Sequence, residues 1–574
     1  MFGNAYILFV RMIDCISLIM SQLFTLGGAI QFRSTDEIVN HRNPARFMRW
    51  SKRKQLLNQF NGGFLLDGKV GRLSRKVSFR SLITTGGMGV GKSANLIIPN
   101  ILTTDHCSLV ISDCSGELYE QTSGYLAAQG YDIQVLNLID PARSHCYNPL
   151  ANVESFSDAE RIAHILTKAV GGGSHAGEPI WDDGAKRLIR ILVCVLKNST
   201  QSETVTLVDV LYWLNHFDGH KPDSKLSAFI IENTHDDTAT YEDYHGFVTS
   251  TPEKMMLSFV STAATSIALI GNTDIAQVLS SNDFDFAAMK EKKTALFVMC
   301  KQQDMGTFAF ILSLFYTELC NALLQDRRGS LPVYMLLDEF GHLKIPGFET
   351  FATTARKYKV GFWLILQSLS QLVEQYGETG ARTMLGGIGT ETYFGGMDLD
   401  TARNISGRLG TAFHLDWLQP SQGLHEKPLM RPDELIRLSD NDLLILHANR
   451  DPVRLHTVPF YQRGDLKNRA RMAPAELPFT LMDKETETVV EQAKFRIQLY
   501  EKGYYGQSED LHDYTYENAG PFATIEELLE VLDESMGKMA EAYNKTYEVS
   551  TFDLFPDTMI EEPHPRRFVP KPLK

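Results

Sequence analysis

Short apolar runs recur along the chain from about residue 77 to residue 394, and each has the length of a β-strand. Turn-forming or polar residues bound the runs, and several runs lack alternation of polar and apolar positions. Continuous runs of this kind are typical of strands buried on both faces of a parallel sheet. We expect strands at 79–84, 108–112, 133–138, 295–299, 333–337, 362–366 and 392–394.

The interval 152–293 has a helical pattern instead, and no clear strand is predicted in it. One helix face is formed by Trp181, Ala185, Leu188, Leu192 and Val195. A second helix is expected over 251–269, starting at Thr251-Pro252. Strands that alternate with helices predict an α/β, doubly wound sheet, and the helical interval predicts an all-α domain inserted into it.

The N-terminal residues 5–30 are mostly apolar. As a helix they would extend about 39 Å, enough to cross a ~30 Å hydrocarbon core. Arg11 and Asp14 interrupt the run and can face each other on one side of the helix. The alternatives are a membrane-spanning helix and an amphipathic helix that lies on the membrane or on a partner. The basic block that begins at Arg33 places the rest of the chain in the cytoplasm.

The charge of the chain is distributed unevenly. The formal net charge of the 574 residues is −14, but residues 501–564 hold 16 Asp/Glu against 3 Lys/Arg, whereas residues 31–80 hold 12 Lys/Arg against 3 Asp/Glu. We expect the acidic tail to contact a partner protein and the basic block to contact the membrane surface or DNA. The seven cysteines include no C-x-x-C pair, which argues against a disulfide framework or a zinc site.

These patterns divide the chain into five parts. We expect a membrane-associated segment at 1–30, a basic linker at 31–76, an α/β domain at 77–151 and 294–466, an all-α domain at 152–293 and an acidic extension at 467–574.

A phosphate-binding motif follows the first expected strand. Residues 86–93 read Gly-Gly-Met-Gly-Val-Gly-Lys-Ser and match G-x-x-x-x-G-K-[ST], with glycines at Gly86, Gly89 and Gly91. Glycines let backbone N–H groups approach phosphates closely. Lys92 is expected to reach the β- and γ-phosphates of ATP, and Ser93 to bind Mg²⁺ through its hydroxyl.

Acidic and amide side chains end two later strands. The run 333–337 is followed by Asp338 and Glu339. Asp338 is expected to hold Mg²⁺, and Glu339 to polarise the attacking water as a general base. Gln367 ends the next strand and is expected to sense the γ-phosphate or the lytic water. Asp113, also at a strand end, could line the nucleotide crevice or simply form a turn with the Ser-Gly that follows.

The chain resembles the type IV secretion coupling proteins, the TraG/TraD group of conjugation ATPases, over about residues 77–462. Seven segments match in order: 86–100, 112–117, 147–150, 180–185, 337–340, 366–372 and 431–435. The resemblance implies a RecA-like motor domain with an all-α domain, anchored at the bacterial inner membrane and assembled as a homohexamer. It also implies a relaxase-linked, single-stranded DNA substrate, relaxosome and secretion-channel partners, and Arg356 as an arginine finger that acts on the neighbour's ATP.

Two departures from the family pattern are visible. The family has two or more N-terminal spans where this chain has at most one, and Ser115 stands where the family has lysine. We therefore keep two alternatives beside a DNA-translocating coupling protein. One is a motor of the FtsK/HerA class in segregation or packaging, and the other is a receptor for exported proteins in which ATP binding regulates docking.

Overall fold

A nine-stranded sheet forms the centre of the molecule. The computed structural model describes residues 45–170, 179–199, 205–325, 331–415 and 424–478. The sheet has the strand order β11-β10-β7-β1-β6-β5-β2-β4-β3. Its strands are β1 (Leu82–Thr85), β2 (Ser108–Asp113), β3 (Asp132–Asn137), β4 (Thr294–Met299), β5 (Val333–Leu337), β6 (Val360–Leu366), β7 (Thr390–Tyr393), β10 (Asp442–His447) and β11 (Val453–His456).

The seven strands from β7 to β3 run parallel, as expected, whereas β10 pairs antiparallel with β7 and β11 pairs antiparallel with β10. A separate hairpin pairs β8 (Thr411–Leu415) with β9 (Leu424–Pro428). The sequence prediction missed these four strands. The sheet is therefore mixed and mostly parallel.

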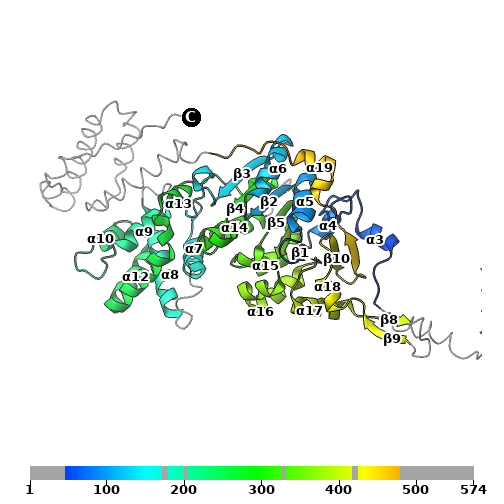
Figure 1. The fold of residues 1–574 in the computed structure, drawn as a ribbon. Coiled ribbons are helices and arrows are strands. Elements are labelled where there is room, and N and C mark those ends of the chain that lie inside the picture. Colours follow the sequence, from blue (N-terminus) through cyan, green and yellow to red (C-terminus); the bar gives the residue numbers. More distant parts are fainter. Residues whose placement is uncertain (1–44, 171–178, 200–204, 326–330, 416–423, 479–574) are drawn as a thin grey trace, which may run out of the picture.

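Helices cover both faces of the sheet (Figure 1). The helices that come before β4 are α3 (Trp50–Leu56), α4 (Arg75–Ser78), α5 (Ile98–Thr103), α6 (Glu117–Ala128), α7 (Phe156–Val170), α8 (Pro179–Asn198), α9 (Leu207–Asn215), α10 (Lys225–Glu232), α11 (Thr238–Ser250), α12 (Glu253–Ser266) and α13 (Thr273–Val278). Those after β4 are α14 (Ala309–Leu323), α15 (Phe348–Thr354), α16 (Leu369–Gly387), α17 (Leu399–Leu409), α18 (Pro432–Ile436) and α19 (Gly464–Arg469).

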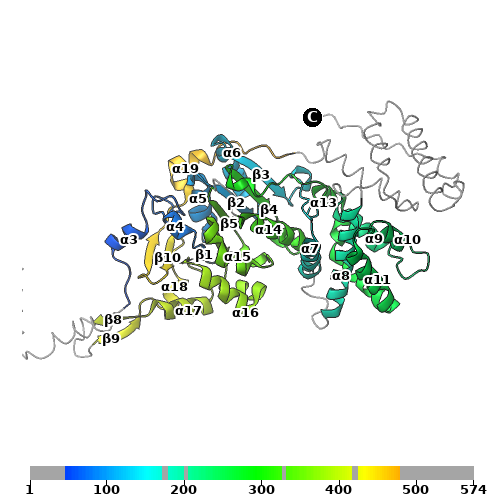
Figure 2. The same cartoon turned by 180° about the vertical axis from the view of Figure 1, so that it is seen from behind.

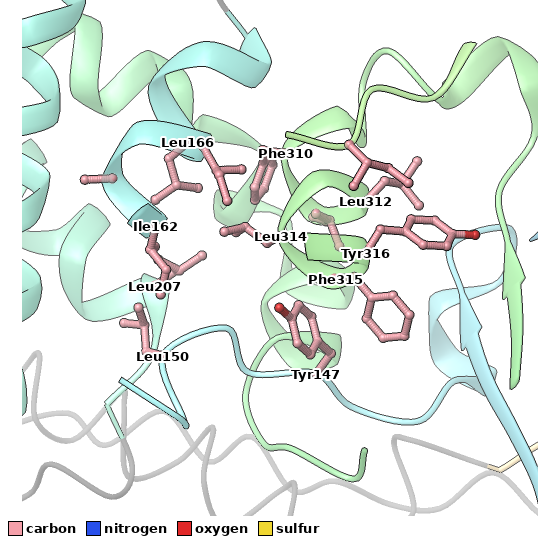
Figure 3. Close-up of a cluster of buried hydrophobic side chains, with 14 of the residues drawn as sticks. Tyr147, Leu150, Ile162, Leu166, Leu207, Phe310, Leu312, Leu314, Phe315 and Tyr316 are labelled. Carbon is pink, nitrogen blue, oxygen red and sulfur yellow. The ribbon is translucent and has the colours of Figure 1, made fainter. Parts of the chain in front are cut away.

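Successive residues of a strand point to opposite faces, and this separates the core into layers. Leu109 and Ile111 of β2 pack with α5 and α6, whereas Val110 of the same strand packs with α7 and α14. The layer on the α14 side continues without a break into helices α8 to α13, which lie to one side of the sheet (Figures 1 and 2). Figure 3 shows this continuity, with Ile162 and Leu166 of α7 opposite Phe310 and Leu314 of α14.

The interval 152–293 contains only helices and turns among its described residues, and Trp181 to Val195 lie on α8 as expected. Two expected boundaries were wrong. The chain over 75–78 forms helix α4 because the Ser74 side chain caps it, so the first strand begins only at Leu82. The expected helix 251–269 is α12, which starts after Pro252 as expected but ends at Ser266, because a separate 3-10 turn, Ala268–Gly271, follows it.

Part of the expected linker 31–76 packs against the sheet. Phe64 is 2% exposed and contacts the rings of Tyr334 and Trp363. The Leu65 N–H donates to Asn100 Oδ1 at 2.8 Å, and Asn100 Nδ2 donates to the Leu65 carbonyl at 2.8 Å. Residues 56–73 therefore contribute to the same core as α5, the helix that follows the phosphate loop.

The start of the expected acidic extension also packs on the domain, against helix α6. The Ala475 N–H donates to Ser123 Oγ at 3.0 Å, and the Tyr119 hydroxyl donates to the Ala475 carbonyl at 2.8 Å. The apolar segment 5–30 and the acidic tail 501–564 lie outside the described residues. In the described ranges, no helix combines the length and the hydropathy that a membrane crossing requires.

Candidate active site

The phosphate-binding motif forms the turn between β1 and the helix that follows it. Gly89 and Gly91 have φ angles of 75° and 79°, which favour glycine. A Cβ atom at Gly86 would lie 2.7 Å from Phe394 Cβ, but one at Gly89 would meet nothing within 4 Å. The loop is thus tightly packed at its base and open at its tip. After Lys92 the backbone forms a π-helical turn, Ser93–Ile97, before α5 begins.

Lys92 lies inside this loop and is only 9% exposed. Its Nζ donates to the carbonyl oxygens of Gly86 at 2.8 Å and Gly87 at 3.1 Å. Burial lowers the pKa of Lys92, while the charges of Glu339 and Asp338 act in the opposite direction. Because both acceptors are neutral carbonyls, the ammonium can give up these hydrogen bonds and donate to phosphate oxygens instead.

Ser93 and Asp338 face each other across the end of the sheet. The Ser93 hydroxyl donates to Asp338 Oδ2 at 3.5 Å, and Ser112 Oγ donates to the Asp338 carbonyl at 3.2 Å. Burial raises the pKa of Asp338 to about 7, and the neighbouring Glu339 carboxylate adds to the increase. A cation between Ser93 and Asp338 would favour the ionised carboxylate. A hydroxyl and a carboxylate are both suitable ligands for Mg²⁺.

Glu339 contacts the amide that we predicted as a sensor. Gln367 Nε2 donates to Glu339 Oε2 at 3.0 Å. Glu339 has a φ angle of 51°, which is uncommon for a residue other than glycine and is characteristic of functional sites. The structure therefore brings Lys92, Ser93, Asp338, Glu339 and Gln367 to one edge of the sheet.

A second glutamine, which the sequence analysis did not select, fixes this arrangement. Gln371 Oε1 accepts the N–H groups of Gln367 at 3.0 Å and Ser368 at 3.3 Å. Its Nε2 is 3.4 Å from Nε2 of His342, which in turn is 2.9 Å from Gln302 Nε2. The signal was present in the sequence, because Ser368 and Gln371 have the spacing of a helix capping box.

Asp113 forms a turn, the second of the two roles considered for it. Its carboxylate accepts the N–H groups of Ser115 at 3.2 Å, Gly116 at 2.9 Å and Tyr119 at 2.8 Å. These bonds hold the first turn of α6 and occupy both carboxylate oxygens. Burial raises the pKa of Asp113, and the three hydrogen bonds oppose the increase.

Arg356 lies apart from the other predicted residues. It precedes β6, whereas Gln367 follows it. Seven residues at ~3.3 Å each separate the two by about 23 Å along the strand. Arg356 is exposed and has no ion-pair partner among the residues with described positions. It therefore cannot reach the phosphate loop of its own chain.

The residues at this edge fit a nucleoside triphosphate and Mg²⁺. The open tip of the glycine loop, the buried ammonium of Lys92 and the facing oxygens of Ser93 and Asp338 provide the groups that phosphate and metal require. When bound, Mg²⁺ would neutralise phosphate charge, and Glu339 and Gln367 are placed to orient water.

Relatives of this chain occur among conjugation and secretion proteins. The protein VirD4 of Rhizobium radiobacter is 28% identical over 415 residues, which are 68% of this chain and 58% of VirD4. The conjugal transfer protein TraG of the same species is 25% identical over 430 residues, which are 70% of this chain and 65% of TraG. The chain spans less than two thirds of the length of either relative.

Solved structures with the same fold include the bacterial conjugative coupling protein TrwBdeltaN70. It is 18% identical, with a TM-score of 0.54 over 72% of this chain and 94% of that chain. The plasmid coupling protein TrwB in complex with ADP and Mg²⁺ is 17% identical, with a TM-score of 0.55 over 72% of this chain and 94% of that chain.

The sequence profile described as "Type IV secretory system Conjugative DNA transfer" matches residues 33–416 and 418–487. The match includes every residue of the site described above and most of the chain. The chain therefore belongs to the type IV secretory system family of conjugative DNA transfer proteins.

Proposed function

We propose that the chain is an ATP-hydrolysing coupling protein that drives a relaxase–DNA substrate into a type IV secretion channel. The observation that carries the proposal is the contact between Gln367 and Glu339 beside the Lys92 loop. A general base next to the phosphates and held by an amide suits activation of water, which is hydrolysis rather than transfer to another substrate.

The proposed roles of the residues follow from their positions at the ends of the strands. A RecA-like nucleotide-binding domain comprises the parallel strands and the phosphate loop, with Lys92 and Ser93 binding ATP and Mg²⁺, Asp338 holding the metal and Glu339 acting as base. Gln367 senses the γ-phosphate, and Arg356 acts on the ATP of the next subunit. Helices α7 to α13 form the all-α domain, supported by their position to one side of the sheet (Figure 2).

The proposed setting is a homohexamer at the cytoplasmic side of the bacterial inner membrane. Its partners are single-stranded DNA linked to a relaxase, the other relaxosome proteins and the secretion channel. The family match supports this setting, as does the basic character of α3, in which Lys52, Arg53 and Lys54 are adjacent.

DNA should stimulate ATP hydrolysis if the chain is a DNA motor. We expect single-stranded DNA to increase the steady-state ATPase rate of the full-length chain, because translocation couples phosphate release to DNA movement. The measurement compares rates without DNA, with single-stranded DNA and with double-stranded DNA at one salt concentration. Equal rates in all three reactions would favour the receptor for exported proteins, and stimulation by duplex alone would favour a motor of the FtsK/HerA class.

Glu339→Gln should bind ATP normally and hydrolyse it about 10²–10⁴-fold more slowly, because general-base assistance has this magnitude. The amide retains the shape of the side chain and a contact with Gln367. Binding of a fluorescent ATP analogue and single-turnover hydrolysis measure the two effects separately. The matched control is Glu374→Gln on the exposed surface of α16. Loss of nucleotide binding in Glu339→Gln alone would mean that Glu339 has a structural role.

A further inference from the structure

A buried lysine lies at the end of the sheet opposite to the phosphate loop. Lys290 is the last residue of a short 3-10 turn, Ala288–Lys290, through which the chain leaves the helical interval and enters β4. The residue is only 2% exposed. Removing an ammonium group from water is unfavourable, and replacement of a buried charged group by an apolar one of similar volume is often neutral or stabilising. A lysine at this position therefore indicates a role other than stability of the core.

The ammonium of Lys290 contacts the turn that carries Arg356. Lys290 Nζ donates to the Tyr358 carbonyl at 2.9 Å and lies 5.5 Å from the centre of the Tyr358 ring. Tyr358 is the last residue of the 3-10 turn Ala355–Tyr358, and Arg356 is the second. A hydrogen bond from a charged donor is stronger than one between neutral groups. Lys290 therefore restrains the backbone two residues from Arg356.

The backbone that follows this turn is in an unusual conformation. Lys359 has a φ angle of 58°, which is uncommon for a residue other than glycine, and β6 begins at the next residue, Val360. The Lys359 N–H donates to the Arg356 carbonyl at 3.3 Å, and the Lys359 carbonyl accepts the Val333 N–H at 3.1 Å. A conformation of this kind persists only where the surrounding structure holds it. The contact from Lys290 is part of that support.

The backbone around Lys290 is itself fixed to two strands. The Lys290 carbonyl accepts the Leu331 N–H at 2.6 Å, shortly before β5 begins. Ser108 Oγ, on the first residue of β2, lies 2.6 Å from the Met289 carbonyl and 3.0 Å from the Lys292 carbonyl. A side chain on a backbone anchored in this way can hold a neighbouring turn in one position.

Arg356 is exposed, so the position of its side chain depends on its backbone. We propose that Lys290 is a positioning residue for Arg356 and that its buried ammonium holds the turn from which the guanidinium reaches the nucleotide of the adjacent subunit. The inference rests on the proposed function, since it deepens the role proposed there for Arg356. Lys290 touches neither nucleotide nor metal and acts through Arg356 alone.

Lys290→Met removes the ammonium and keeps a side chain of similar length. We expect amide hydrogen exchange over residues 355–359 of the full-length chain to become at least about tenfold faster, because the loss of a hydrogen bond to a charged group changes a local opening equilibrium by this much. Exchange over residues 86–93, in the phosphate loop, should be unchanged. The matched control is Lys292→Met, which removes an exposed ammonium two residues away and should leave both segments unchanged.

ATP hydrolysis distinguishes positioning of Arg356 from a general effect on the fold. Lys290→Met should lower kcat by about 10–10²-fold with unchanged affinity for ATP, since misplacement of a reacting group by an ångström costs up to about 10²-fold. The defect should fall on the neighbour's site, so mixing with Lys92→Ala subunits should restore activity above that of either variant alone. In the Arg356→Ala background, Lys290→Met should cause no further loss, because residues that share one function are not additive.

Lys290→Gln retains an N–H donor one bond closer to the backbone. It replaces Lys290→Met if that variant does not fold, and should show the same pattern with smaller changes. Unchanged exchange over residues 355–359, or a loss of ATP affinity that Lys92→Ala subunits do not rescue, would overturn the inference. Normal hydrolysis by Lys290→Met beside an impaired Arg356→Ala would also overturn it and leave the proposed function intact. Normal hydrolysis by Arg356→Ala would instead remove the arginine finger and the inference together.

Discussion

Lys92→Ala is expected to abolish ATP hydrolysis and substrate transfer. Lys92 Nζ lies 2.8 Å from the Gly86 carbonyl and 3.1 Å from that of Gly87, at the centre of the loop that would enclose the β- and γ-phosphates. Without the ammonium, those phosphates would lie beside Asp338 and Glu339 with less compensating charge. Phosphate-release assays on the full-length chain and transfer assays in cells measure the two losses.

Two further variants test whether the loss of activity depends on the ammonium group at this position. Lys69→Ala removes an exposed lysine from the loop before β1 and should retain normal activity. Lys92→Arg keeps the charge but replaces a compact ammonium with a planar group, so it should recover little of the rate. Normal transfer by Lys92→Ala would exclude an ATP-driven mechanism.

The central parallel strands could be predicted because their sequences are continuously apolar. In β4 and β5 every residue is buried, so no polar position interrupts the runs 295–299 and 333–337. Strands at the end of the sheet are harder to recognise. In β11, Val453 and Leu455 are buried while Arg454 and His456 are exposed, and a run of only four residues with this alternation gives a weak signal.

The grouping of the candidate active-site residues could be predicted because each belongs to a local motif at a strand end. Parallel strands place those ends at one edge, so Lys92, Asp338 and Gln367 meet although they are far apart in the chain. The spacing of Ser368 and Gln371 predicts that Gln371 caps the helix. Its connection with the site is seen only in the structure, where Gln371 accepts the Gln367 N–H. An Asp113 that forms a turn and an Asp113 that lines the site would have the same sequence pattern. The three N–H groups that its carboxylate accepts in the structure distinguish the two roles.

The contact between Tyr147 and Glu318 could not be predicted from the sequence. Tyr147 and Glu318 are 171 residues apart and belong to no common motif, and their contact depends on how the segment before α7 packs against α14. The packing of residues 56–73 could not be predicted either, because the excess of basic residues over 31–80 is typical of an exposed linker, whereas Phe64, Leu66 and Leu73 are buried in the core.

Arg356→Ala is expected to reduce ATP hydrolysis by about 10³–10⁵-fold, the contribution of an arginine finger where one has been measured. The reason lies in the position of Arg356 in the turn before β6, with its own phosphate loop at the other end of the parallel strands. In the proposed ring, an exposed guanidinium in that position would act on the nucleotide of an adjacent subunit. Lys357→Ala, at the next exposed position, is the matched control and should retain most of the activity.

Action on a neighbouring subunit predicts complementation between two inactive variants. In a ring with head-to-tail interfaces, an Arg356→Ala subunit offers an intact loop and a Lys92→Ala subunit offers an intact arginine. Random mixing in equal amounts makes about one interface in four complete, so part of the activity should return. Mixing Lys92→Ala with Glu339→Gln should restore nothing, because both residues belong to the same subunit's site. Rings that assemble from the first pair and remain inactive at every mixing ratio would show that Arg356 is not the finger.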